Sequence, residues 1–130
     1  MDNENEIIIF EAEDKSISLP VRIENDSVWL NRNQIAVLFE RDIKTIGKHI
    51  NNALKEELSE LNSVVAKFAT TATDNKKYMV EHYNLDIIIT VGYRVKSKRG
   101  VEFRRWANYV VFIVFGCFER FKQMEIMFGG

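Results

Sequence analysis

Cations at helical spacing mark the part of this chain best suited to binding chemistry. In the segment IKTIGKHINNALKEEL, residues 43–58, Lys44 and Lys48 stand four residues apart and Thr45 follows the first of them. A lysine can donate to guanine O6 or N7, and a threonine can donate, accept or offer its methyl group to thymine. The segment therefore predicts contact with base edges in a DNA groove. Further candidates are His49 in the same groove and Arg32, Arg41 and Asn52 on the phosphate backbone.

A helix over 43–58 would pack its apolar side in the core and leave those cations exposed on the other side. Asp42 is a good N-cap for it, and Asn31 is a good N-cap for a first helix over 32–39. Two short helices joined by so brief a turn predict a helix-turn-helix pair, whose second helix enters the major groove. The alternative is an ordinary helical hairpin with a solvated lysine face. The expected core-facing residues are Ile35, Ala36, Leu38 and Phe39 on the first helix and Ile43, Ile46, Ile50, Ala53 and Leu54 on the second.

The pattern around this pair predicts an α+β domain. Alternating apolar residues and turn residues predict strands over 6–12, 17–24 and 27–30, and a hairpin over 64–84 that would act as a wing. Pro20 cannot donate to a sheet, so we expect its strand at an edge or bulged there. Asn84 would cap a helix over 85–95, which Gly92 weakens near its end, and a last helix over 100–122 completes a C-terminal pair. The expected core residues of the 85–95 helix are Ile87, Ile88, Val91 and Tyr93.

The net charge of −1 conceals a segregation of charge along the chain. Residues 1–26 carry eight acids against two cations, residues 31–55 five cations against two acids, and residues 92–105 six cations against one acid. Such basic blocks are typical of a domain that offers one face to phosphate, although solvated basic faces with no ligand look the same. The second block predicts a basic loop for phosphate or minor-groove contact. Its candidates are Lys96, Lys98 and Arg99, and those at the hairpin tip are Lys76 and Lys77.

Other classes of protein find little support in the sequence. Cys117 is the lone cysteine, so we expect no disulfide, no zinc site and a reducing, cytoplasmic setting. The N-terminus lacks the features of a secretory signal, and the apolar stretch 106–118 is too short to cross a bilayer. Since His49 and His82 lie far apart and no glycine-rich phosphate loop is present, we expect neither an enzyme nor a cofactor or metal. His82 reads as a structural residue.

Two stretches of the chain resemble a known family. These are VWLNRNQIAVLFERDIKTIGKHINNALKEEL and NSVVAKFATTATDNKKYMVEHYNLDIIITVGYRVKSKRGVEFRRWA, within which YNLDIIITVGYRVKSKRGVEFRRWA is the most specific. They resemble the virulence protein RhuM family of bacteria, over most of residues 7–108. The resemblance implies a virulence-associated protein similar to the Bro-N and KilA-N DNA-binding proteins of phages and mobile elements. It brings no catalytic residues.

The resemblance is expected to stop after Asn108. Residues 109–118, YVVFIVFGCF, are dense in β-branched and aromatic side chains where the family continues with a charged region. We therefore expect a DNA-binding domain over 1–108 and a divergent apolar extension over 109–130, the product of a truncation or frameshift. An apolar tail must be buried, either on its own domain or in a homodimer formed through the C-terminal helix.

The sequence thus favours a DNA-binding protein, regulatory and linked to a mobile element or to virulence, which inserts the 43–58 helix into the major groove of duplex DNA. The alternative is a protein–protein interaction module that positions a partner or a missing effector domain. Salt separates the two, because binding through several phosphates weakens steeply as salt rises whereas apolar association does not.

Overall fold

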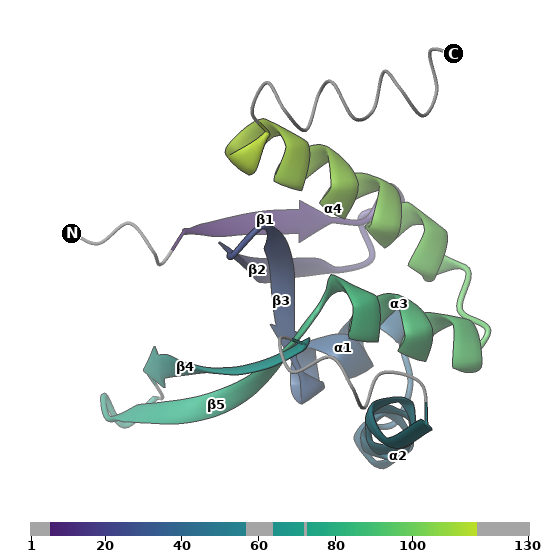
Figure 1. Cartoon of the computed structure of the whole chain (residues 1–130), viewed down its shortest axis with the longest axis horizontal. Coiled ribbons are helices and arrows are strands. Elements are labelled where there is room, and N and C mark those ends of the chain that lie inside the picture. The colour runs from purple at the N-terminus through teal and green to yellow at the C-terminus, as the bar shows by residue number, and fades with distance from the viewer. Residues whose placement is uncertain (1–5, 57–63, 72, 117–130) are drawn as a thin grey trace.

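One five-stranded antiparallel sheet joins two hairpins that lie far apart in the sequence (Figure 1). The computed structural model describes residues 6–56, 64–71 and 73–116, and these form an α+β fold. The strand order is β1-β2-β3-β5-β4, so β3 links the N-terminal strands to the hairpin formed by β4 and β5. The bounds are β1 Ile7–Glu11, β2 Ser18–Glu24, β3 Ser27–Asn31, β4 Val65–Thr71 and β5 Lys77–Asn84.

The first three helices begin where the sequence places capping side chains. Asn31 Oδ1 accepts from Gln34 N, and the Gln34 side chain accepts from Asn31 N, which completes a capping box. Asp42 Oδ2 accepts from the N–H of Lys44 at 2.9 Å and of Thr45 at 3.3 Å. The predicted ends of the second and fourth helices at 58 and 122 lie outside the described residues. The helices are α1 Arg32–Phe39, α2 Ile43–Glu56, α3 Leu85–Arg94, capped by Asn84, and α4 Arg99–Phe115.

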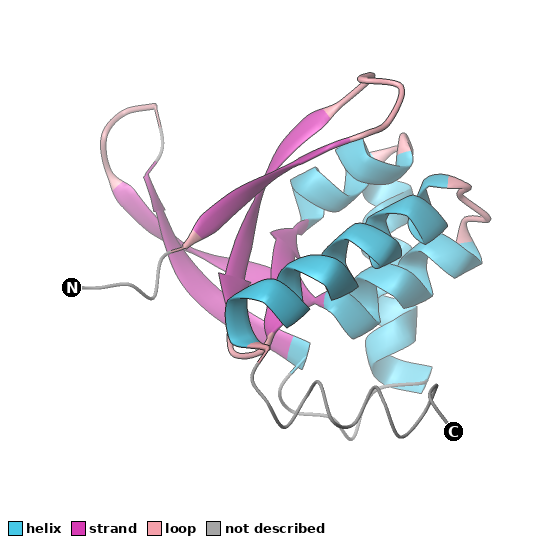
Figure 2. Cartoon of the chain, turned by 90° about the horizontal axis from the view of Figure 1, so that it is seen from above, coloured by secondary structure: helices cyan, strands magenta, loops and turns pink. Residues whose placement is uncertain are grey.

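The helices gather against one side of the sheet, as Figure 2 shows. Alternation along β2 buries Leu19, Val21 and Ile23 in the same cluster as helix residues such as Ile50 and Phe103. This cluster is continuous over the described residues and includes side chains from every helix. It fixes which side of each helix faces inward and hence which side remains available to a ligand.

The position of Pro20 corrects one prediction and explains why the residue is tolerated. Strand β2 is not an edge strand, because β1 and β3 lie on either side of it. However, its pairing with β3 runs only from Arg22 to Glu24, so Pro20 lies beyond it and is paired with Ile9 of β1 alone. The missing N–H therefore costs no bond to β3. The Pro20 carbonyl accepts from Gln34 Nε2 at 3.0 Å.

Two predictions about the helix surfaces are wrong. Tyr93 was expected in the core, but its side chain is 85% exposed. Ile43 was expected in the buried stripe of α2 and is 40% exposed, because it opens that helix at the molecular surface. Gly92, which was expected to weaken α3 near its end, also has a packing role. It is buried, and a Cβ there would lie 2.7 Å from Phe39 Cζ, so only a glycine lets the ring approach this closely.

We expect Gly92→Ala to destabilise the protein by about 1–3 kcal/mol, since the added methyl group overpacks the contact with Phe39. Gly100→Ala is the matched control. It is also helical, but its Cβ would meet Phe39 Cε1 at an ordinary 3.9 Å. That variant should be stabilised by up to about 1 kcal/mol through helix propensity. Urea unfolding measures both, and equal effects of the two substitutions would contradict the close-packing argument.

Candidate nucleic-acid interface

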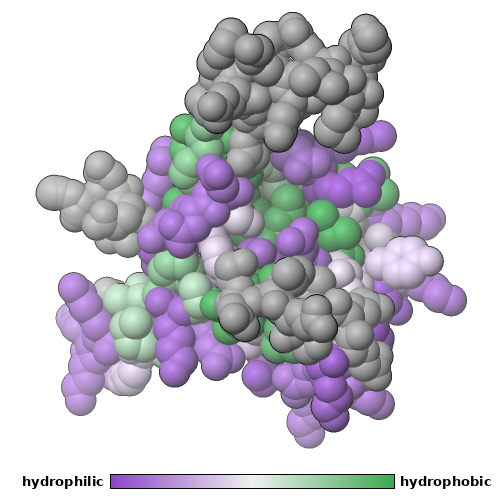
Figure 3. All heavy atoms as spheres, in the orientation of Figure 1, coloured by the Kyte–Doolittle hydropathy of each residue, from purple (hydrophilic) through white to green (hydrophobic). Residues whose placement is uncertain are grey.

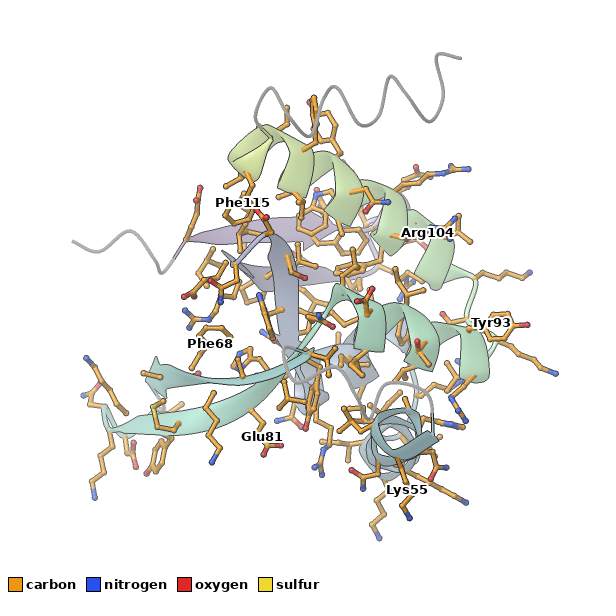
Figure 4. The ribbon with its side chains drawn as sticks, in the orientation of Figure 1. Lys55, Phe68, Glu81, Tyr93, Arg104 and Phe115 are labelled. Carbon is orange, nitrogen blue, oxygen red and sulfur yellow. The ribbon has the colours of Figure 1, made fainter. Side chains whose placement is uncertain are left out.

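The exposed side of α2 carries a line of polar and cationic side chains. Lys44, Lys48, Asn51 and Lys55 are all exposed and follow the spacing of a single helical face. Asn51 was not among the predicted site residues, although its spacing from Lys44 and Lys48 could have identified it. Lys55 points away from the body of the protein in Figure 4. The opposite side of the helix is held in the core by Ile46, Ile50 and Ala53.

The other predicted residues of α2 differ in their exposure to solvent. Thr45 is exposed next to Lys44, whereas His49 and Asn52 are half-buried at the border of the exposed face. The Nδ1 atom of His49 is buried and has no hydrogen-bond partner among the described residues. Thr45 is therefore the predicted groove residue that best accompanies the lysines.

Arg32 of α1 lies over α2 at Gly47. A Cβ on Gly47 would be 3.5 Å from both Cδ and Nη1 of Arg32, so the glycine leaves room for the arginine side chain. Arg32 is exposed and is the first residue of α1. Its charge lowers the pKa of the Tyr83 hydroxyl and so opposes the larger effects that raise it. The fold thus brings Arg32 beside the cations of α2, as its predicted role requires.

Strand β5 borders the start of α2 across a shallow pocket of about 290 Å³. Its lining includes Arg32, Ile43, Glu81 and Tyr83. The pKa of Tyr83 is raised, mainly by burial. The hydrogen bond that its hydroxyl donates to Glu81 Oε1 at 3.0 Å raises this pKa further. Figure 4 shows Glu81 and Lys55 on the same, lower side of the molecule. A carboxylate therefore limits the positive surface on the side of β5.

The two basic blocks of the sequence meet in the fold. The α1–α2 turn lies against the α3–α4 loop, because Arg41 Nη2 donates to Val95 O at 2.7 Å. Lys96 and Lys98 in that loop are exposed. Arg99 instead turns inward, with a side chain only 14% exposed, and is paired with Glu40 at 3.3 Å. Of the predicted loop cations, the two lysines thus remain open to a ligand, and Arg99 is bonded within the protein.

The hairpin tip stands apart from α2 (Figure 1). Lys76 and Lys77 are exposed there, beside Asp74, which accepts from the N–H of Lys76 and the hydroxyl of Tyr78. Asn75 has a left-handed backbone with φ 67°, which suits a tight turn. The structure therefore places these lysines in a separate patch. In Figure 3 hydrophilic residues cover much of the lower part of the molecule, over the hairpin and around α2.

His82 lies in an apolar setting. It is 4% exposed, its ring meets Phe68 edge-on at 5.1 Å, and its Nδ1 is 2.9 Å from Val80 O. Burial lowers the pKa of this histidine, and the charge of Arg22 adds to the effect. In the described ranges, no three His, Cys, Asp or Glu side chains are grouped so that they could hold a metal ion. The absence of enzymatic activity stays a prediction.

The lowered pKa of His82 predicts acid sensitivity. Because the folded protein binds the proton less readily, stability is complete above the ordinary pKa of 6.5 and decreases as the pH falls below it. We expect the free energy of unfolding, measured by urea titration, to fall between pH 7.5 and 5.5. His82→Gln should reduce that fall. An unchanged fall in the His82 variant would show that other groups cause it.

Comparison with known proteins gives one match. No curated protein and no solved structure matches the chain significantly. No helix within the described ranges is long and apolar enough to cross a membrane. The family model that matches covers β4, β5, α3 and α4 and leaves α1 and α2 outside; it also runs past Asn108, where the resemblance was expected to stop. The resemblance drawn from the sequence is thereby confirmed for this part of the chain: residues 63–119 match the model of the virulence protein RhuM family.

Proposed function

We propose that this protein binds duplex DNA by inserting α2 into the major groove. The observation that carries the proposal is the line formed by Lys44, Lys48, Asn51 and Lys55 on a helix whose other side is fixed in the core. Between Ile43 and Lys55 the helix contains no acidic residue. A face of this kind is complementary to phosphate and base edges, and a major groove is wide enough to admit a helix.

The residues take different roles along the helix. The N-terminal part of a recognition helix reaches the base edges, so Lys44, Thr45 and Lys48 act as reading residues. Asn51 can form a bidentate pair with adenine, and Lys55 reaches a phosphate at the far end. Arg32, which lies over Gly47, contacts the backbone beside the groove. The family supports a virulence-associated role, and a regulatory function on a mobile element in the bacterial cytoplasm is part of the proposal.

Two further patches extend the contact. Lys96 and Lys98 lie next to the α1–α2 turn and can hold the DNA backbone beside the start of α2. Lys76 and Lys77 at the hairpin tip are placed to touch the backbone at a distance from α2, as a wing does. These exposed lysines supply affinity rather than sequence preference, because phosphate contacts carry no base information.

The proposal predicts salt-dependent binding that needs the cations of α2. Fluorescence anisotropy with a labelled duplex should show affinity that decreases as salt rises. In Lys44→Ala/Lys48→Ala the affinity should fall at least tenfold, because two cations that read base edges are lost. Lys55→Ala, which removes a phosphate contact, should lower the slope of log K against log salt by about 0.9. The matched control for the double variant is Arg104→Ala/Arg105→Ala, which removes the same charge from α4 and should bind nearly as well as the wild type.

The substitution Asp42→Asn should increase the affinity for DNA, whereas the lysine substitutions decrease it. Asparagine keeps an oxygen that can accept from the N–H of Lys44 and Thr45, so the cap survives. The variant loses the negative charge at the start of α2 and should bind about two- to fivefold more tightly at low salt. Equal losses in the two double variants would indicate nonspecific attraction, and no binding by the folded wild type would refute the proposal.

The apolar surface of α4 supports association of the protein with a second copy of itself. Val101, Tyr109 and Ile113 are exposed on one side of that helix, with Tyr109 at 66%. A homodimer formed through this side would bury it and would present two α2 helices to a two-fold symmetric site.

We expect light scattering after size exclusion to give about twice the monomer mass for the wild type and the monomer mass for Tyr109→Glu, because a buried carboxylate opposes apolar association. Met79→Glu, an equally exposed apolar position on the hairpin, should stay dimeric. A monomeric wild type at high concentration would exclude the homodimer.

A further inference from the structure

Two arginines connect the turn between α1 and α2 to other parts of the fold. We propose that Arg41 and Arg99 are positioning residues that set the orientation of α2 toward DNA, and that neither is itself a phosphate contact. We call this pair the arginine clamp. The inference rests on the proposed function for its effect on DNA, whereas the clamp itself concerns the protein alone. It reassigns two residues that the charge pattern had marked for DNA.

Arg99 reaches three segments at once. Its Nη1 donates to Leu38 O at 2.9 Å and to Glu40 Oε2 at 3.3 Å, and its Nη2 donates to Ser16 Oγ at 2.8 Å. Leu38 O belongs to the last turn of α1, where carbonyls have no partner within the helix. The start of α4 thus completes the end of α1 and joins it to the turn between β1 and β2.

Arg41 completes the same end of α1 from the other side. Its Nη1 donates to Phe39 O at 2.9 Å, and its Nη2 donates to Val95 O at 2.7 Å, just after α3 ends. The last two carbonyls of α1 are therefore both held by guanidinium groups. Between these bonds the backbone of Glu40 is left-handed, with φ 54°, a conformation that a residue with a side chain seldom adopts unless its surroundings hold it there.

The direction of α2 depends on this turn, because only Glu40, Arg41 and Asp42 separate it from α1. A guanidinium is a planar fork, so two bonds from it fix an angle as well as a distance, which a lysine ammonium cannot do. Arg99 comes from the segment that matches the RhuM family, whereas the turn that it holds lies outside that segment. The matched segment therefore supports the helix that is proposed to read DNA.

The salt dependence of binding distinguishes a positioning role of Arg99 from a direct phosphate contact. Its guanidinium is largely buried and paired with Glu40, so it releases no counterion from DNA. Loss of a phosphate contact lowers the slope of log K against log salt by about 0.9, but loss of a positioning residue lowers affinity and leaves the slope unchanged. The substitution Arg99→Lys keeps the charge and removes the fork.

The experiment measures DNA binding and amide hydrogen exchange on the full chain. The duplex is one selected from a random pool by the wild-type protein. We expect Arg99→Lys to bind it about tenfold more weakly with an unchanged salt slope, whereas Lys55→Ala, which removes a phosphate contact, loses about one unit of slope. Amides of residues 39–46 should exchange faster in Arg99→Lys and at the wild-type rate in Lys55→Ala. Ser16→Ala, which removes a single acceptor of the fork, should show the same changes to a smaller extent and serves if Arg99→Lys does not fold.

A reduced salt slope in Arg99→Lys would overturn the clamp and make Arg99 a phosphate contact, with the DNA-binding proposal intact. If the wild-type protein selects no duplex, the DNA-binding proposal fails and hydrogen exchange alone decides on the clamp. Unchanged exchange over 39–46 in both Arg99→Lys and Ser16→Ala would then overturn it.

Discussion

The end of α1 is where the two halves of the chain meet, and the rest of the structure depends on how it is buried. The Phe39 ring is 2% exposed and lies against Gly92 of α3, close enough that no larger residue fits there. Burying a phenylalanine stabilises a fold by about 1.5–3 kcal/mol, but the unpaired carbonyls that follow such a ring into the interior would cost a similar amount. Arg41 and Arg99 satisfy those carbonyls. Apolar packing and the arginine bonds therefore stabilise the same junction.

This junction determines what surface the protein offers. With α1 fixed against α3, the short turn leaves α2 few orientations, and its apolar side completes the core. The lysines of α2 then face outward, and Arg32 crosses the helix at Gly47. Glu11 and Glu24 lie in β1 and β2, away from α2 (Figure 1), whereas Asp14 in their connecting turn shares a pocket with Arg41 beside the start of α2. The overall net charge of −1 is therefore compatible with a locally cationic face.

Local signals made most of the fold predictable, whereas long-range contacts did not. The start of α1 follows from Asn31, whose capping box depends only on residues three apart, and both strands of the hairpin follow from alternation and turn residues. The inward orientation of Arg99 could not be predicted, because its acceptor Leu38 O is 61 residues away and a backbone carbonyl has no sequence signature. Tyr93 was misplaced for a related reason: aromatic character suggests a core position, but no residue in the described part of the chain covers it on that side of α3, and it is 85% exposed.

The residues that would contact a ligand differ from the residues that hold α1 and α2 in place. Lys44, Lys48 and Asn51 lie on the side of α2 opposite its buried residues, so changing them alters the surface without disturbing the packing of Ile46 and Ile50. Arg99 and Gly92 are in the reverse position, since they touch no solvent-facing part of α2 but fix the helix before it. A surface that varies independently of its support can change its ligand preference at little cost in stability. The RhuM match covers Gly92 and Arg99 but neither α1 nor α2, so it bears on one side of the junction and not on what the exposed helix binds.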